Sequence, residues 1–321
     1  MPEPSNPTDA AAATDFAPGV AYGGPIIDAH HHVWDLDENL YPWLMPSGNV
    51  PHRYGDYSAI KKNYLASDYL RDISDVGVTS SVYMEAEWDP TDALGEVRYI
   101  AGVAKETGVP GAMAAQAWLD ADDVESTLEA LSEFDIVRSV RHKPGGPATR
   151  ADAVAGNQTL MSNPTWRRGY ELLGRFGLHF ELQTPWWNLP EACALADTYP
   201  ATTLIINHSG VLLDREPETI RAWSEAMAQA AVCPNVFVKA SGLCVEGKPW
   251  TVDLNRDIVL SIIELFGAER VMFGSNFPVD GMFTTYRELV DGYTQITRGL
   301  SASEKRDFFF GTAQKLYAPI A

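Results

Sequence analysis

The run Asp28–Ala29–His30–His31–His32 places histidines two residues apart within a stretch that has the composition of a β-strand. Side chains two apart along a strand face the same side, so we expect His30 and His32 to face one side and His31 the other. Paired neutral imidazoles are suited to Zn²⁺ or a similar divalent ion. We expect Asp28, on the same face, to orient one of these rings. The alternative is that the three histidines only form hydrogen bonds within the core.

Polar side chains also stand at the ends of other β-rich runs, where a buried polar group without a purpose would be costly. They are Glu85, Arg141, His142, Gln183, His208, Lys239 and Asn276. The cations among them favour a carboxylate-bearing substrate, which a guanidinium can bind through two parallel hydrogen bonds. For Arg141 the alternative is an ion pair with Glu85 or Glu181, and Gln183 or Lys239 could equally be structural.

Tryptophans follow several of the same runs, and they could wall an apolar, water-restricted pocket. We expect Trp34, Trp88 and Trp186 to contact substrate. The alternative is that tryptophans at these positions pack in the core and the loops.

The elements that position these residues are eight short β-rich runs that alternate with amphipathic stretches. The runs cover residues 25–30, 78–85, 110–119, 137–142, 177–183, 202–210, 235–242 and 270–276. Several are almost continuously apolar, as in strands buried on both faces. This pattern predicts a single-domain, distorted (β/α)8 TIM-like barrel over residues 25–321, whose functional groups gather at the C-terminal strand ends. A doubly wound open sheet is the rival, but no G-x-G-x-x-G follows the first run.

Local signals give the boundaries between these elements. Asn163–Pro164 and Asn188–Leu189–Pro190 predict helix starts, and Gly108 and Gly177 predict helix ends. Residues 302–317 are expected to form a closing helix. The long segment 36–66 after the first run could form a lid.

Composition restricts the partners. The chain has 321 residues, 45% of them hydrophobic, and a formal net charge of −19. Such a charge repels nucleic acid and anionic lipid, and no apolar stretch is long enough to span a bilayer. Residues 1–24 read as a flexible tail without the features of a secretory signal. Three sparse cysteines, Cys193, Cys233 and Cys244, favour a reducing compartment, so we expect a cytoplasmic location.

Several of these motifs, in this order, resemble the amidohydrolase superfamily, and in particular the amidohydrolase-2 branch with its fuconolactonase-like and pyrone-dicarboxylate lactonase-like enzymes. The resemblance covers nearly the whole chain after Pro25 and rests on Asp28-x-His30-x-His32, Arg141–His142, His208 with Gly210, Lys239 with Ser241–Gly242, Gly274–Ser275–Asn276–Phe277–Pro278, Tyr41–Pro42–Trp43–Leu44 and Phe310–Gly311–Thr312–Ala313–Gln314–Lys315–Leu316–Tyr317. It implies a TIM barrel that hydrolyses lactones of sugar acids or of carboxylated catabolic intermediates. Some members hold one divalent metal through the H-x-H pair, the sixth-strand histidine and an eighth-strand aspartate, whereas others need no metal.

The chain departs from this pattern at Asn276, which stands where the aspartate is common. An amide is a poor Zn²⁺ ligand and cannot act as a base. Asp280, four residues on, is a possible substitute.

The resulting hypothesis is a lactonase, in which water attacks the lactone carbonyl. His30, His32 and His208 are assigned to a metal site, with Zn²⁺ the expected ion, or to a metal-free water site, and Asn276 to holding the water. Lys239, Arg141 and His142 would bind a carboxylate or the oxyanion, and the base would be Glu85, Asp280 or a histidine. The alternatives are a metal-dependent decarboxylase of the same superfamily and a binding pseudoenzyme. A homodimer is also possible.

Overall fold

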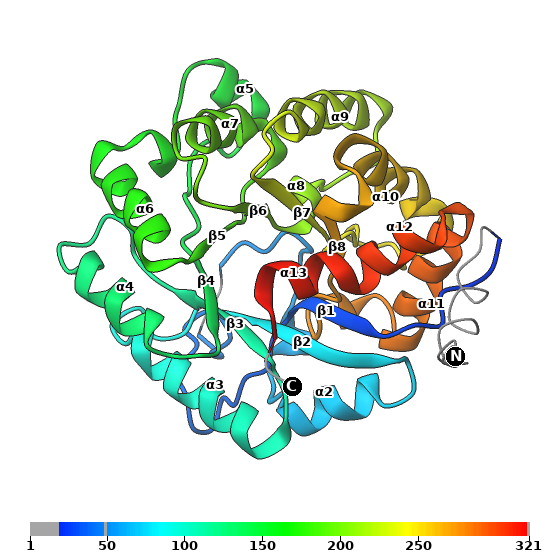
Figure 1. Cartoon of the computed structure of the whole chain (residues 1–321), viewed down its shortest axis with the longest axis horizontal. Helices are drawn as coiled ribbons and strands as arrows, with labels where there is room; N and C mark the ends of the chain where they lie inside the picture. Colours follow the sequence, from blue (N-terminus) through cyan, green and yellow to red (C-terminus); the bar gives the residue numbers. More distant parts are fainter. Residues whose placement is uncertain (1–18, 48–49, 320–321) are drawn as a thin grey trace, which may run out of the picture.

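The strands form a single parallel barrel, seen in a computed structural model that describes residues 19–47 and 50–319 (Figure 1). Their order around the barrel follows the sequence from β1 to β8, and a bridge between His31 and Phe277 links the last strand end to the first. The strands are β1 (Ile26–His31), β2 (Val78–Met84), β3 (Ala112–Gln116), β4 (Val137–Arg141), β5 (His179–Leu182), β6 (Leu204–Ile206), β7 (Val236–Ala240) and β8 (Val271–Phe273). Each of the eight overlaps one of the predicted runs, which confirms the predicted barrel.

Helices surround the strands as an outer layer (Figure 1). They are α2 (Ala66–Ile73), α3 (Ala93–Thr107), α4 (Val124–Ser132), α5 (Arg150–Val154), α6 (Pro164–Phe176), α7 (Leu189–Thr198), α9 (Pro217–Ala231), α10 (Val252–Phe266), α11 (Tyr286–Ile296) and α12 (Ala302–Arg306). The short segment α8 (His208–Val211), which has positive φ throughout, follows β6, and α13 (Thr312–Tyr317) closes the chain. Their ends follow the expected signals. The Asn163 side chain caps α6 by accepting from two backbone N–H groups, and Gly108 and Gly177 end α3 and α6 in left-handed conformation.

The closing helix seals the N-terminal end of the barrel. In α13, Ala313 and Tyr317 pack with Ile27, Ala112 and Phe237 from the strands. The Tyr317 carbonyl accepts from Arg138 at 2.9 Å. A ligand must therefore enter at the opposite end, where the strands finish.

The N-terminal segment does not remain a flexible tail as far as residue 24. Tyr22 is buried and stacks on Phe309 with ring centroids 4.7 Å apart, and Gly19 donates its N–H to the Arg298 carbonyl. The prediction is wrong for residues 19–24 because an aromatic side chain there completes the core. Residues 1–18 lie outside the described part.

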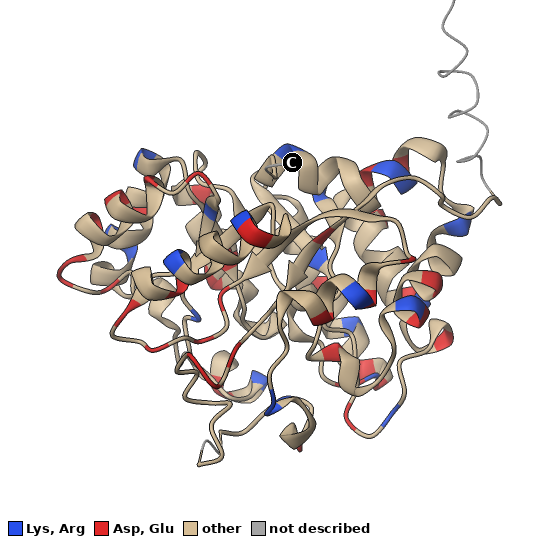
Figure 2. Cartoon of the chain, turned by 90° about the horizontal axis from the view of Figure 1, so that it is seen from below, with Lys and Arg blue, Asp and Glu red and all other residues tan. Residues whose placement is uncertain are grey.

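Charged residues lie mainly on the outer helices and loops, while the strands carry few (Figure 2). The three cysteines are free, as expected. Among the described residues no helix combines the length and the apolar character needed to cross a membrane.

Candidate active site

The histidine run ends β1 with a bulge that changes which side chains face the barrel. The pairing with β2 shifts register between Asp28 and His31. His30 and His32 turn inward and His31 stacks on Tyr69 of α2 at 4.0 Å, as predicted. Asp28 was expected on the inward face, and this is wrong, because the extra residue of the bulge reverses the alternation.

Asp28 instead faces the helical layer, where it is fully buried. Its carboxylate accepts from the hydroxyls of Tyr69, Tyr286 and Ser275 at 2.6–3.1 Å. Burial raises the pKa of this carboxyl, and the hydrogen bonds from Ser275 oppose the rise. Asp28 therefore anchors the ends of β1 and β8 to the helices and orients no histidine ring.

The three predicted histidines converge. The ring centroids of His30 lie 4.4 Å from His208 and 5.2 Å from His32. Burial, followed for His32 by the charge of Arg141 and for His208 by that of Arg53, lowers their pKa values well below the usual range. All three rings are thus neutral at neutral pH.

Hydrogen bonds fix the orientation of two of these rings. His32 Nδ1 lies 2.8 Å from the Met84 carbonyl, so it must donate, which leaves Nε2 as an acceptor. His208 Nδ1 lies 3.1 Å from Ser241 Oγ. His32 and His208 line a cavity. The third ring, that of His30, is buried, and neither of its nitrogens has a hydrogen-bond partner among the described residues.

Asn276 lies beside these rings and is held by Asp280. Its Nδ2 donates to Asp280 Oδ1 at 2.6 Å, and its backbone N–H donates to the His30 carbonyl at 2.7 Å. Burial raises the pKa of Asp280 to about 6, although the charge of Arg53 opposes the rise. Asp280 is buried behind Asn276 and does not line the cavity, so it is not placed to reach substrate.

Glu85 and Arg141 form an ion pair with each other. Arg141 Nε donates to Glu85 Oε1 in a fully buried ion pair, and its Nη1 donates to Gln183 Oε1 at 2.9 Å. The alternative reading of Arg141 as an ion-pair partner is confirmed. Glu85 is therefore not a free base. Arg141 and Gln183 still line the cavity.

Lys239 lies below the cavity rather than in it. Its Nζ is 2.9 Å from Glu181 and 5.1 Å from the ring centroid of Tyr317, in the helix that seals the far end. Burial lowers the pKa of Lys239 to about 8, against the opposing effect of Glu181. The long side chain runs down into the barrel and does not line the cavity, so the expected contact between Lys239 and substrate stays a prediction.

His142 and three tryptophans also point elsewhere. The Nδ1 atom of His142 accepts from the Leu119 N–H and from Trp166 Nε1, both at 3.0 Å, because the ring turns toward the helices. His142, Trp34, Trp88 and Trp186 do not line the cavity, and their contacts with substrate stay a prediction. Their alternative reading as packing residues is the better one, since all are buried.

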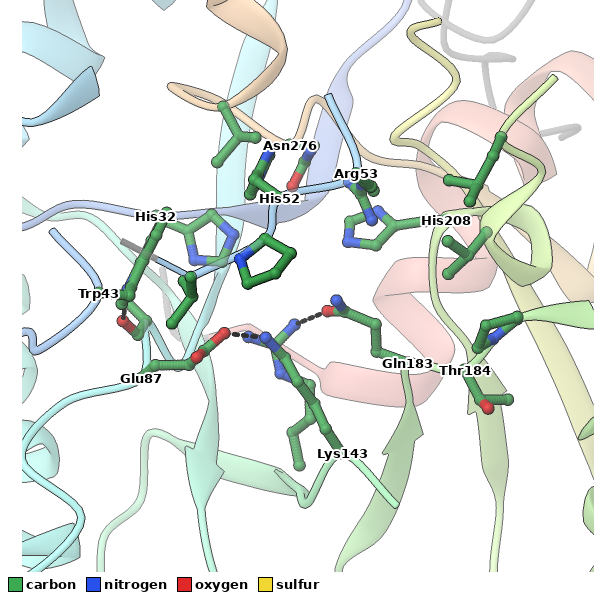
Figure 3. A pocket seen from close by; sticks show the side chains of 18 residues that line it. His32, Trp43, His52, Arg53, Glu87, Lys143, Gln183, Thr184, His208 and Asn276 are labelled. Atoms are coloured by element: carbon green, nitrogen blue, oxygen red, sulfur yellow. Dashed lines mark hydrogen bonds and ion pairs between the residues drawn. The ribbon is translucent and has the colours of Figure 1, made fainter. Parts of the chain in front are cut away.

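The cavity has a volume of about 450 Å³ and opens at the C-terminal ends of the strands. Figure 3 shows its polar lining. The complete lining is His32, Trp43, Val50, Pro51, His52, Arg53, Ala86, Glu87, Arg141, Lys143, Gln183, Thr184, Pro185, His208, Val211, Leu213, Asn276 and Val279.

The segment predicted as a lid, residues 36–66, supplies part of this lining. Trp43, His52 and Arg53 come from it. Trp43 belongs to the Tyr41–Leu44 motif noted in the sequence, whereas His52 and Arg53 were not singled out. The sequence signal that could have identified them is the pair of adjacent basic residues, His52 and Arg53, in the long segment after the first strand. Lys143 and Glu87 follow the fourth and second runs and were assigned no role from the sequence; they form an ion pair at the mouth.

Backbone strain is concentrated around the cavity. Glu87, His208, Val211 and Asn276 all line it, and all have φ between 52° and 56°. Residues other than glycine seldom adopt this backbone conformation, and β-branched residues such as valine adopt it least often. Such strain is typical of functional sites, where the surrounding structure over-determines the backbone.

The residues present do not fit a resident metal ion in this arrangement. Within residues 19–47 and 50–319 no group of three or more His, Cys, Asp and Glu side chains is arranged to hold one. Asn276 brings an amide to the eighth-strand position, and its nearest carboxylate, Asp280, is occupied by that amide. The assignment of His30, His32 and His208 to a metal stays a prediction.

Comparisons with known proteins agree with this architecture. The family model described as "Amidohydrolase" matches residues 27–318. An uncharacterized protein of Sinorhizobium fredii, y4mH, is 35% identical, with 91% of this chain and 98% of that one covered. An L-fucono-1,5-lactonase of Burkholderia multivorans is 25% identical over 91% of this chain and 95% of its own. The crystal structure of an amidohydrolase from Burkholderia multivorans with bound zinc, 22% identical, has a TM-score of 0.75 and covers 92% of this chain and 100% of its own. The chain belongs to the amidohydrolase family.

Proposed function

We propose that the protein is a lactonase that opens a cyclic ester by water attack at the carbonyl. The observation that carries the proposal is the convergence of His32 Nε2, His208 and Asn276 on one cavity at the C-terminal strand ends. The similarity to a lactonase supports the reaction class. A cavity of about 450 Å³ suits a sugar-acid lactone or a carboxylated catabolic lactone.

The orientation of Asn276 favours it as the group that holds the water. Because its Nδ2 donates to Asp280, its Oδ1 is left to accept from a ligand. A water bound to that oxygen keeps its second hydrogen for a base. Asp280 would thus be a positioning residue for the Asn276 amide.

His32 is the base that we favour among the candidates. The Met84 carbonyl holds its Nδ1 protonated, so Nε2 carries the lone pair, and His32 lines the cavity. Glu85 is occupied by Arg141, and Asp280 lies behind Asn276. His32 would take a proton from the attacking water and return it to the ring oxygen when the ester C–O bond breaks.

The decarboxylase alternative depends more firmly on a metal, and the amide at Asn276 disfavours it. The lactonase proposal derives no step from a metal ion. Two measurements test directly whether the reaction needs a metal: the metal content by elemental analysis, and the turnover before and after chelation.

The test of function is an assay of a panel of lactones, in which hydrolysis is measured as the loss of the ester signal. The panel includes L-fucono-1,5-lactone, other sugar-acid lactones and a pyrone dicarboxylate. For the best substrate we expect His32→Gln to lower kcat by about 100- to 10,000-fold, the usual effect of losing a general base. His179→Gln is the matched control, because His179 begins β5 at the far end of the barrel and contacts the Leu316 carbonyl. No turnover of any lactone by the wild-type protein would contradict the proposal and favour a binding role.

A further inference from the structure

Arg53 is a cation at the cavity, and it is not paired with a carboxylate in any salt bridge of the described residues. Arg141 pairs with Glu85, and Lys143 pairs with Glu87. In the described part of the chain Arg53 forms no salt bridge, although its side chain lines the cavity. Its guanidinium carbon lies 4.6 Å from the ring centroid of Tyr54, a contact that holds it in place.

The guanidinium lies against His208, as Figure 3 shows. A Cβ on Gly242 would stand 2.5 Å from His208 Nδ1 and 2.8 Å from Arg53 Nη2. The absent side chain of Gly242, whose φ is +60°, is therefore what lets these two groups share one small volume. The charge of Arg53 is also the largest electrostatic influence on the pKa values of both His208 and Asp280.

We propose that Arg53 is a catalytic residue whose guanidinium stabilises the oxyanion formed on the lactone carbonyl, supplying the positive charge that a metal ion would otherwise bring. This inference rests on the proposed lactonase function. A fixed cation beside His208 would repel a divalent ion. Asn276 offers no negative charge there, and the nearest carboxylate, Asp280, lies behind the Asn276 amide and is occupied by it. The arrangement thus favours one organic cation over a metal.

The step balances without a further reactant. The water oxygen bonds to the carbonyl carbon, the C=O electron pair moves to the oxygen beside Arg53, and His32 Nε2 receives the proton. The oxyanion then collapses, the ring C–O bond breaks, and the proton passes to the leaving oxygen. The product is the open hydroxy acid.

The first experiment compares Arg53→Met and Arg53→Lys with the wild-type protein on the best lactone. Loss of one oxyanion donor typically lowers kcat by about 100- to 1,000-fold, so we expect that fall for Arg53→Met with little change in KM. Arg53→Lys should recover part of kcat, and Arg150→Met, which alters an exposed arginine outside the cavity, should change neither constant. A raised KM with unchanged kcat would overturn the proposal, because Arg53 would then only anchor substrate.

The second experiment does not depend on turnover, so it separates this inference from the lactonase proposal. Zn²⁺ is titrated by calorimetry into Asn276→Asp and into Asn276→Asp/Arg53→Met, with circular dichroism to verify folding. We expect at least about tenfold tighter zinc binding when the Arg53 charge is removed, since the two cations repel each other. Equal affinities, or stoichiometric zinc in wild-type protein with chelator-sensitive turnover, would overturn the proposal.

Discussion

The Asn276 amide nitrogen donates to the Asp280 carboxylate at 2.6 Å, so this carboxylate holds the amide instead of facing the cavity. The hydroxyl of Tyr54 donates to the same carboxylate oxygen at 3.2 Å. Asp280 therefore links the eighth strand end to the segment that carries Arg53. The charge of this carboxylate is costly, since it is almost fully buried.

The first prediction concerns the pH dependence of stability at Asp280. Its pKa is raised from 3.8 to about 6 in the folded protein, so between these values the folded state binds more protons than the unfolded state. Asp280 thus makes stability fall as pH rises through that window. Asp280→Asn should remove this pH-dependent loss of stability. The stability of the variant relative to wild type should therefore increase as pH rises from 4 to 6. Thermal unfolding of both proteins across that range checks it, and a constant difference in Tm would contradict it.

The barrel was predictable from sequence because buried parallel strands carry continuous apolar runs and the helix ends carry local signals. The Thr203–Ile206 run and the Asn163 cap are examples in which the side chains themselves determine the element. The topology then brings the strand ends together, which is why His30, His32, His208 and Asn276 converge as expected.

Other parts of the site depend on contacts that sequence does not contain. A one-residue bulge reverses the direction of Asp28, and no residue type in that run signals it. Glu85 and Arg141 meet across the end of β3, because β2 and β4 flank that strand and carry opposite charges at their ends, so each satisfies the other. Arg53 reaches His208 through the path of a long loop, and loop paths are set by tertiary packing rather than by local pattern.

The second prediction concerns the buried Glu85–Arg141 ion pair. Glu85→Gln leaves the guanidinium of Arg141 buried without a counter-charge, and breaking such a pair typically lowers the free energy of unfolding by about 3–5 kcal/mol. The exposed Glu129→Gln is the control, with an expected change within about 0.5 kcal/mol. Denaturant unfolding measures both. If Glu85→Gln unfolds like wild type but loses turnover, Glu85 acts in catalysis rather than as a structural partner.

The third prediction separates backbone strain from side-chain displacement at Gly242. Gly242→Ala puts a Cβ in left-handed conformation, which costs about 1–2 kcal/mol, and places it 2.5 Å from His208 Nδ1. Gly145 is a matched control, because its φ is +58° and a Cβ there would meet nothing within 4 Å. Gly145→Ala should therefore lose only the stability due to strain.

Gly242→Ala should lose more stability than Gly145→Ala, because the new Cβ must also displace His208 and Arg53 from each other. A displacement of about 1 Å at a reacting centre can cost about 100-fold in rate, so kcat should fall for Gly242→Ala alone. Thermal unfolding and lactone turnover of the two variants give the comparison. Equal kcat in both would mean that the close approach of His208 and Arg53 has no part in the reaction, because only Gly242→Ala disturbs it.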